Sequence, residues 1–409
     1  MSAPTKTVRD RYTDDQIAGF YAAGYWQPGS FTALAAEQAG RRGDQTFIFD
    51  STTSLTYADF RVKALGLAVG LRRQGLRRGD RVAVQLPNWT DFAVVAAALS
   101  RIGAILVPIM PIYRQDEVGY VLRHSGAVAA VTCEEFRGFG HLAMFEELRS
   151  AAPDLRALYV ARAAGSDATP SLDSLVVDGG LAALDEEAGP DSSPDDGFLI
   201  VYTSGTTSRP KGCFHTFNTV RASATAIMKS LEYTERDVQF GPSPITHSTG
   251  LVTSVVMPLL AGAKSYLMEA WDPQEGLSRI EQYGCTAAVT ATPFLQMLVA
   301  AYDPAKHDAG SMRLWVCAGS PIPGAIVERS RELLGCRTLS LYGRSENFLT
   351  TMCTVSDPPG RSASSDGSAL EGAEVKIVGM DGLELPRGEE GDITYRGPSH
   401  MIEYFRDDE

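Results

Sequence analysis

The chain has 409 residues, of which 44% are hydrophobic and 21% are charged, enough for one large multi-lobed body or two to three ordinary domains. Its 37 Lys and Arg residues against 50 Asp and Glu residues give a formal net charge of −13, without any Lys/Arg-rich run, which argues against generic nucleic-acid binding. No stretch reaches the roughly 18 uninterrupted apolar residues of a membrane span, and residues 1–15 lack the apolar region of a signal peptide, so we expect a cytoplasmic protein.

Between residues 81 and 131, apolar runs alternate with segments of helical period. The pattern predicts strands over Arg81–Leu86, Ala104–Val107 and Ala127–Val131, and helices over Phe92–Ile102 and Glu117–His124. A β-α-β-α order is typical of a mainly parallel sheet covered by helices. We therefore expect a first α/β subdomain over residues 1–195.

The segment 164–196 is rich in Gly, Ser, Asp and Pro, which predicts a long surface connection. The α/β rhythm resumes with the apolar run Gly197–Tyr202 and continues to about residue 341, so residues 196–341 form the second predicted α/β subdomain.

After residue 372, two alternating strands flank Asp381 and Gly382, a dipeptide that favours a tight hairpin turn. This pattern predicts an antiparallel, barrel-like β subdomain over residues 342–409. The expected fold class is thus α/β, with layered, helix-covered sheets of mainly parallel strands and a small antiparallel unit at the C-terminal end.

A phosphate loop is predicted directly after the strand Gly197–Tyr202, where residues 203–212 read TSGTTSRPKG. Hydroxyl groups and glycine-freed backbone N–H groups can surround phosphoryl oxygens, and a lysine adds positive charge. A Walker A loop is excluded because Pro210 precedes Lys211 and Gly212 follows it, so an ordinary P-loop kinase is disfavoured. A polar surface turn is the alternative. The candidate ligands are Thr203, Ser204, Gly205, Thr206, Thr207 and Lys211.

Four further apolar strands are followed by polar or glycine-rich segments. Residues 338–346 end in a serine and a carboxylate, Glu346, which suits Mg²⁺ on a nucleotide. Residues 314–321 contain Gly319, which lets a planar base approach the backbone. The remaining two are residues 242–250, with His247, and residues 287–294. Because ligands of open α/β sheets bind beyond the carboxyl ends of strands, we expect the five segments to line one cleft.

On these motifs the chain resembles the adenylate-forming superfamily, which comprises acyl-CoA synthetases, adenylation domains of peptide synthetases and luciferases. Residues 202–212 match its signature loop and residues 341–346 (LYGRSE) its second core motif, while residues 79–82 and 395–398 are typical family phrases. The resemblance implies that MgATP converts a carboxylic acid into an acyl-adenylate, with release of pyrophosphate. The acyl group then passes to the thiol of coenzyme A or of a carrier-protein phosphopantetheine.

The same resemblance implies a role for each candidate residue. Thr203–Lys211 would hold the β- and γ-phosphates, and Glu346 would bind Mg²⁺. Ser345, at the place of the family's usual threonine, would contact the α-phosphate, and His247 would stand at the junction of the acyl and nucleotide sites. The catalytic set is His247, Ser345 and Glu346; the adenine site is Gly319, Ser320, Pro321, Tyr342 and Gly343; the acyl pocket is Thr249, Gly250 and Leu251.

The apolar stretches 251–260 and 291–300 favour a bulky apolar acid over an amino acid, so we expect the N-terminal domain of an acyl-CoA ligase. Family members continue into a small C-terminal lid domain whose lysine assists adenylation, and this sequence has no such lysine, which predicts impaired turnover. Arg344 places a bulky cation inside the second motif. The alternatives are a non-adenylating ligase that uses a preformed acyl-adenylate only for thioesterification to CoA, and a catalytically incomplete adenylate-binding module.

Overall fold

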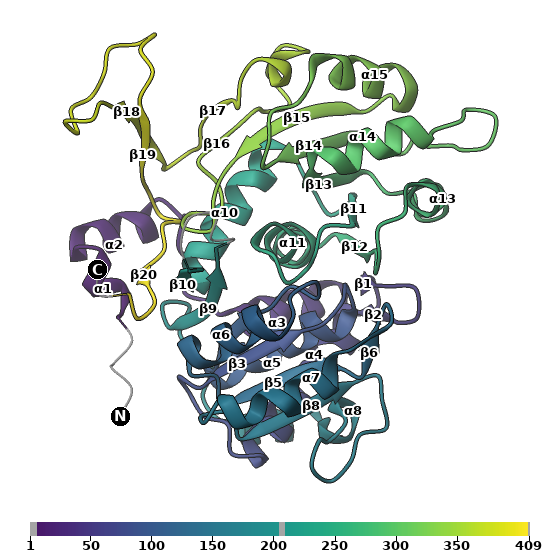
Figure 1. The fold of residues 1–409 in the computed structure, drawn as a ribbon, viewed down its shortest axis with the longest axis vertical. Helices are drawn as coiled ribbons and strands as arrows, with labels where there is room; N and C mark the ends of the chain where they lie inside the picture. Colours follow the sequence, from purple (N-terminus) through teal and green to yellow (C-terminus); the bar gives the residue numbers. More distant parts are fainter. Residues whose placement is uncertain (1–5, 204–208, 408–409) are drawn as a thin grey trace.

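Two β-sheets of mainly parallel strands organise the chain in the computed structural model, which describes residues 6–203 and 209–407. The strand orders are β20-β10-β9-β4-β3-β5-β8 and β17-β16-β15-β14-β13-β11-β12-β1-β2. In Figure 1, β3, β5 and β8 of the seven-stranded sheet lie in the lower half of the molecule, and β13, β14 and β15 of the nine-stranded sheet lie in the upper half.

The seven-stranded sheet is parallel from β9 to β8 and antiparallel where β10 and β20 join it. Most strands of its parallel part are buried and largely apolar, as is typical of a parallel sheet that is covered on both faces. The strands of the whole sheet are β3 (Arg81–Gln85), β4 (Ile105–Pro108), β5 (Ala129–Cys133), β8 (Ala157–Ala161), β9 (Gly197–Tyr202), β10 (Gly212–Thr216) and β20 (Glu403–Tyr404).

The nine-stranded sheet has a parallel centre, from β1 to β15, with an antiparallel strand beyond β1 and two beyond β15. Its strands are β1 (Thr46–Phe49), β2 (Ser54–Thr56), β11 (Val238–Gly241), β12 (Lys264–Leu267), β13 (Ala287–Ala291), β14 (Leu314–Ala318), β15 (Arg337–Tyr342), β16 (Thr351–Met352) and β17 (Ser368–Ala369). Each sheet thus takes strands from both sides of residue 195, and the division into three subdomains stays a prediction.

Helices connect the strands and close the core between the two sheets. Every residue of α5 (Thr90–Ile102) is buried, which explains why its sequence, TDFAVVAAALSRI, is apolar around most of the helix. Apart from α8 and α9, which are described below, the other helices of the described residues are α1 (Val8–Arg11), α2 (Asp14–Ala22), α3 (Phe31–Arg42), α4 (Tyr57–Arg73), α6 (Gln115–Ser125), α7 (His141–Leu148), α10 (Phe217–Ser230), α11 (Ser248–Leu251), α12 (Met257–Ala261), α13 (Pro273–Tyr283), α14 (Thr292–Ala301) and α15 (Gly324–Leu334). A π-helical turn, Val252–Val256, joins α11 to α12, and 3₁₀ turns lie at Arg149–Ala151 and Arg361–Ala363.

The segment 164–196 is more ordered than its composition predicts. It contains α8 (Leu172–Leu175) and α9 (Leu181–Ala188), and Leu175 and Leu184 are buried where these helices pack on α4. The segment still connects β8 to β9 with most of its residues exposed or half-buried, as expected of a surface connection, but leucines at helical spacing add two short helices to it.

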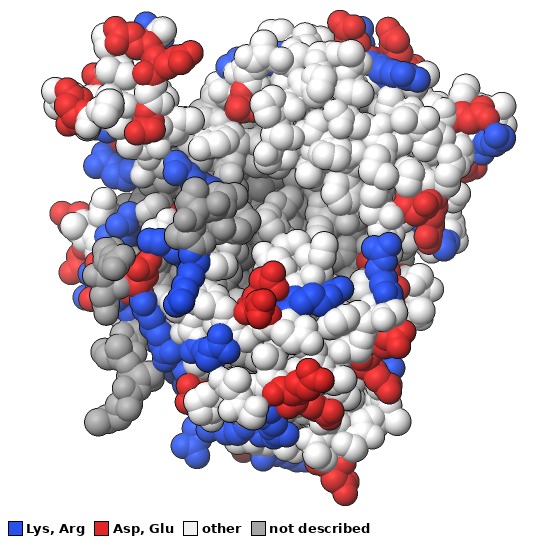
Figure 2. All heavy atoms as spheres, viewed as in Figure 1, with Lys and Arg blue, Asp and Glu red and all other residues white. Residues whose placement is uncertain are grey.

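Antiparallel strands flank Asp381 and Gly382 as predicted, in the hairpin of β18 (Glu374–Val378) and β19 (Asp392–Arg396), but residues 379–391 separate the two strands, so the dipeptide is not a tight turn directly between them. Because β16, β17 and β20 join the two large sheets, the barrel-like subdomain over residues 342–409 stays a prediction. The hairpin projects from the body of the molecule (Figure 1) and carries a group of acidic side chains (Figure 2). A second small hairpin pairs β6 (Glu135–Phe136) with β7 (Phe139–Gly140). These elements confirm the α/β fold class with small antiparallel sheets. No helix in residues 6–203 and 209–407 is both long and apolar enough to cross a membrane.

Candidate active site

The polar strand ends predicted from sequence meet because of the sheet topology. β11, β13, β14 and β15 are parallel neighbours, so their carboxyl ends lie along one edge of the nine-stranded sheet. The ends of β13 and β14 are joined where Thr292 Oγ1 donates to the Ser320 carbonyl oxygen at 3.1 Å. The fifth end, at Tyr202 on β9, belongs to the seven-stranded sheet. Four of the five segments thus share one sheet edge, and the phosphate loop comes from the other sheet.

The base of the phosphate loop is closed by two hydrogen bonds between Thr203 and Lys211. The Thr203 N–H donates to the Lys211 carbonyl at 2.9 Å, and the Lys211 N–H donates to Thr203 Oγ1 at 3.1 Å. The candidates Ser204, Gly205, Thr206 and Thr207 lie outside the described residues. The ammonium of Lys211 lies 2.7 Å from a carboxylate oxygen of Asp407 and 4.9 Å from the centroid of the Tyr404 ring.

The second motif forms a tight loop after β15. A Cβ at Gly343 would lie 2.0 Å from the Phe348 carbonyl oxygen, so the loop can close only with glycine at this position. Two further bonds hold its backbone: the Met401 N–H donates to the Glu346 carbonyl at 2.7 Å, and Ser223 Oγ donates to the Asn347 carbonyl at 3.3 Å. The backbone that carries Ser345 and Glu346 is therefore anchored from several elements.

Glu346 is half-buried, and one of its two carboxylate oxygens has a protein partner. The hydroxyl of Tyr404 donates to Glu346 Oε1 at 2.6 Å. Burial and the neighbouring carboxylate raise the pKa of Tyr404, so this phenol stays protonated and donates. Glu346 Oε2 has no hydrogen bond to any described residue, which leaves an oxygen of the kind that Mg²⁺ prefers.

The surroundings of Glu346 fit a magnesium ion that is shared with a nucleotide. No group of three or more His, Cys, Asp or Glu residues within 6–203 and 209–407 could hold a metal ion. Mg²⁺ is commonly bound through one or two carboxylates together with substrate phosphates and water. Glu346 is placed to be such a carboxylate.

His215, which sequence reasoning missed, also holds the second motif. It lies on β10, is fully buried, and its Nε2 lies 2.8 Å from the Ser345 carbonyl oxygen. Burial lowers its pKa to about 3, so the ring is neutral at physiological pH. No local sequence signal identifies this residue, because its partner lies in a distant segment of the chain.

His247 is the N-cap residue of the short helix α11, which contains the three acyl-pocket candidates. Its Nδ1 accepts the Thr249 N–H at 3.2 Å, so in the neutral ring the proton is on Nε2. The side chain is exposed, yet partial desolvation lowers its pKa below the usual value. Within the described residues, His247 makes no hydrogen bond or ion pair to Lys211 or Glu346.

The acyl candidates lie on or beside the same helix. Thr249 is half-buried, and Gly250 and Leu251 are buried. A Cβ at Gly250 would lie 2.1 Å from the Pro244 carbonyl oxygen, so glycine lets the segment that precedes His247 pack against α11. The π-helical turn that follows, Val252–Val256, is buried, and its three valines belong to the hydrophobic core.

The adenine candidates lie at the carboxyl ends of two neighbouring strands, β14 and β15. Gly319, Ser320 and Pro321 are exposed, and Gly319 has φ +81°, a left-handed conformation that favours glycine. Tyr342 is half-buried at the end of β15. The guanidinium of Arg344 donates to the Ile393 carbonyl at 3.1 Å, so this cation is directed toward β19.

Figure 2 shows the surface hollowed between the two halves of the molecule. One cavity of about 470 Å³ is lined by Pro242 and Pro244 of the segment that leads to His247. Its wall also carries three aromatic rings, two arginines and one carboxylate: Phe136, Trp271, Phe294, Arg114, Arg137 and Glu269.

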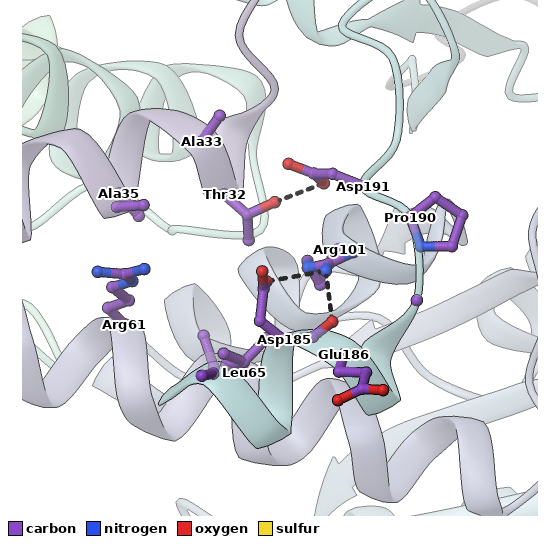
Figure 3. A pocket seen from close by; sticks show the side chains of 14 residues that line it. Thr32, Ala33, Ala35, Arg61, Leu65, Arg101, Asp185, Glu186, Pro190 and Asp191 are labelled. Carbon is purple, nitrogen blue, oxygen red and sulfur yellow. Dashed lines mark hydrogen bonds and ion pairs between the residues drawn. The ribbon is translucent and has the colours of Figure 1, made fainter. Parts of the chain in front are cut away.

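A larger cavity of about 740 Å³ lies elsewhere, among α3, α4, α5 and α9 (Figure 3). Arg101 in its wall donates to the carbonyl and carboxylate oxygens of Asp185, which neutralise it. None of the five predicted segments lines this cavity, whereas Pro242, Pro244 and Phe294 of two of them line the smaller one, so the larger volume does not make it the candidate active site.

Comparisons with known proteins give one matching family and several similar proteins. The model of a family described as AMP-binding enzyme matches residues 35–405. Over 401 residues the chain is 30% identical to the medium-chain fatty-acid–CoA ligase of Escherichia coli (strain K12), which covers 97% of this chain and 70% of that protein. A second relative is the 3-[(3aS,4S,7aS)-7a-methyl-1,5-dioxo-octahydro-1H-inden-4-yl]propanoyl:CoA ligase of Rhodococcus jostii (strain RHA1). The two sequences are 29% identical over 388 residues, and the match covers 92% of this chain and 73% of that protein. The apo structure of MbtA from Mycobacterium smegmatis is similar with a TM-score of 0.84 and 26% identity, over 97% of this chain and 72% of that one.

Proposed function

The chain belongs to the AMP-binding enzyme family, and we propose that it binds MgATP and a bulky apolar carboxylic acid, joins them as an acyl-adenylate and transfers the acyl group to coenzyme A. One observation carries this proposal. Lys211 of the phosphate loop and Glu346 of the second motif both contact the side chain of Tyr404. A cation and an acidic group at one place fit a metal-bound polyphosphate.

The first half-reaction joins the acid to the nucleotide. A carboxylate oxygen of the acid attacks the α-phosphorus of ATP, the bond to the bridging oxygen breaks, and pyrophosphate leaves. In our proposal Thr203–Lys211 holds the β- and γ-phosphates, and the Ser345 hydroxyl donates to an α-phosphate oxygen. Glu346 would be the protein ligand of Mg²⁺, which when bound offsets negative charge on the phosphates.

His247 and the glycine turn complete the proposed site. Because His247 Nδ1 accepts a backbone N–H, its Nε2–H is the group available to donate to an acyl or phosphate oxygen. Gly319, Ser320 and Pro321 would border the adenine on one side, and Tyr342 and Gly343 on the other. In the second half-reaction a thiol sulfur attacks the acyl carbonyl carbon and AMP leaves.

The proposed acid and acceptor follow from the residues near His247, from the cavity next to Pro244 and from the relatives. Gly250 and Leu251 are buried beside the apolar π-helical turn, which suits a bulky apolar acyl group. The cavity next to Pro244 combines arginines with aromatic rings, which fits the phosphates and adenine of coenzyme A. Two relatives carry names that describe CoA ligases of such acids.

Calorimetry of this chain tests the proposal without requiring turnover. The ligands are MgATP and, separately, a hydrolysis-resistant acyl-adenylate analogue with a bulky apolar acyl group. We expect both ligands to bind to the wild type. Lys211→Ala should weaken the binding of MgATP more than the binding of the analogue, because the analogue lacks β- and γ-phosphates. Binding of the analogue alone would favour a ligase that uses a preformed adenylate, and binding of neither would refute the assignment.

A further inference from the structure

The strand β20 brings Tyr404 to the centre of the candidate site. The Ile402 N–H donates to the Phe214 carbonyl at 2.8 Å, and the Phe405 N–H donates to the Gly212 carbonyl at 2.7 Å. These bonds on either side of Tyr404 fix its backbone against β10, the strand that begins directly after Lys211. Tyr404 therefore has a defined position relative to both motifs.

The two ends of the Tyr404 side chain have different partners. Its hydroxyl donates to Glu346 Oε1 at 2.6 Å, and the Lys211 ammonium lies 4.9 Å from its ring centroid. A glutamate has three rotatable side-chain bonds, and a single strong hydrogen bond to one oxygen restricts where the other oxygen can lie. An aromatic ring beside an ammonium contributes a cation–π attraction.

We propose that Tyr404 is a positioning residue for the divalent cation of the bound nucleotide: its hydroxyl holds Glu346 Oε1, so that Oε2 is presented to the metal. This inference rests on the proposed function, because it assumes that Glu346 binds Mg²⁺ on ATP. Tyr404 itself touches neither substrate nor metal. Hydrogen-bond partners of metal-binding carboxylates commonly change metal affinity by about 10- to 100-fold when removed.

The test compares ATP binding by the 409-residue chain in EDTA with ATP binding in saturating Mg²⁺. The ratio of the two dissociation constants measures how much the metal contributes. We expect Tyr404→Phe to lower this ratio about tenfold and to leave the affinity for metal-free ATP unchanged. Electron paramagnetic resonance of Mn²⁺ in the ATP complex gives a second readout, since loss of the Glu346 ligand alters the spectrum. Glu346→Gln provides the reference for full loss.

Tyr57→Phe is the matched control. It also removes one buried hydroxyl, which donates to the Ala263 carbonyl at 2.7 Å in the core. We expect the metal contribution of this variant to equal that of the wild type. Thermal unfolding of each variant verifies that the comparison is made between folded proteins.

The outcomes separate this inference from the proposed function. A Tyr404→Phe protein with the wild-type ratio and Mn²⁺ spectrum would overturn the inference, and so would equal weakening of metal-free and Mg²⁺-bound ATP, which indicates a structural role. A wild type that binds ATP equally with and without Mg²⁺ would overturn the inference and leave ATP binding intact. A wild type that binds neither ATP nor the acyl-adenylate analogue would refute both.

Discussion

The Lys211 ammonium lies 2.7 Å from an Asp407 carboxylate oxygen, so the cation expected to hold phosphate already has an anionic neighbour within the chain. Both side chains are partly exposed, and ion pairs of this kind contribute about 0.2–1 kcal/mol. A phosphate that binds Lys211 has to compete with this carboxylate. In the proposed site, we therefore expect the pair to reduce the affinity for nucleotide by a small amount.

Asp407→Asn should tighten MgATP binding by about two- to fivefold, since removal of the carboxylate charge ends the competition. Calorimetry at low and high salt measures the effect, which should shrink as salt screens the pair. Lys306 and Asp303 form an ion pair elsewhere on the surface, so Asp303→Asn is the control for a general change in charge. Weaker MgATP binding by Asp407→Asn would show that the carboxylate supports the site.

The bond between His215 and Ser345 predicts unequal effects for two substitutions. A carbonyl only accepts, so His215 Nε2 carries the ring proton and donates, and Nδ1 faces the Thr219 hydroxyl at 3.1 Å. His215→Phe leaves the Ser345 carbonyl without this donor and should lower the free energy of unfolding by about 1–3 kcal/mol. It should also weaken binding of the adenylate analogue. His215→Gln retains an Nε2 donor and should lose less in both urea unfolding and calorimetry; equal losses would contradict this role.

Buried histidines also predict how stability depends on pH. Burial lowers the pKa of His215 to about 3, and of His141 and His400 to about 4. In the unfolded chain these groups take up protons near pH 6.5, so between pH 6 and 4.5 the unfolded state binds more protons. The free energy of unfolding should therefore fall on acidification, by up to about 1.4 kcal/mol per pH unit for each histidine.

Urea unfolding of the wild type and of His215→Gln across this range isolates one histidine. The stability difference between the two proteins should change by about 1.5–2 kcal/mol from pH 6 to pH 4.5, with the wild type losing more. A constant difference would mean that His215 is protonated in the native state, in conflict with its burial.

The candidate site shows which contacts a sequence can predict. β11, β13, β14 and β15 each end in a polar or glycine-rich segment, and parallel pairing of such strands follows from the α/β rhythm. The resemblance in residues 202–212 and 341–346 agrees with the family match over residues 35–405. Local pattern was sufficient here because each motif follows its own strand directly.

Long-range pairing explains what the sequence did not reveal. β20 has only two residues, Glu403 and Tyr404, and its position beside β10 depends on segments about 190 residues apart, whose pairing no hydrophobic period encodes. His215 likewise finds its partner in a distant loop. The helices α8 and α9 are short and lie in a segment rich in Gly, Ser and Asp, so only the spacing of their leucines indicates them.

The substitution Gly343→Ala adds one methyl group and tests whether the second motif needs the tight backbone conformation that is seen after β15. In Gly343→Ala the new Cβ would lie 2.0 Å from the Phe348 carbonyl oxygen, so the loop that carries Ser345 and Glu346 has to move. We expect a loss of about 1–3 kcal/mol in the free energy of unfolding and weaker binding of both MgATP and the adenylate analogue. Gly40, inside α3, is the matched control, because a Cβ there meets nothing within 4 Å.

Gly40→Ala should stabilise the protein by about 0.5–1 kcal/mol, since alanine restricts the unfolded chain and fits a helix without strain. Opposite signs at the two positions would show that the Gly343 effect comes from the collision and not from the general change of glycine to alanine. If Gly343→Ala unfolds like the wild type and binds both ligands normally, the loop tolerates a shift and its tight closure is not required for the site.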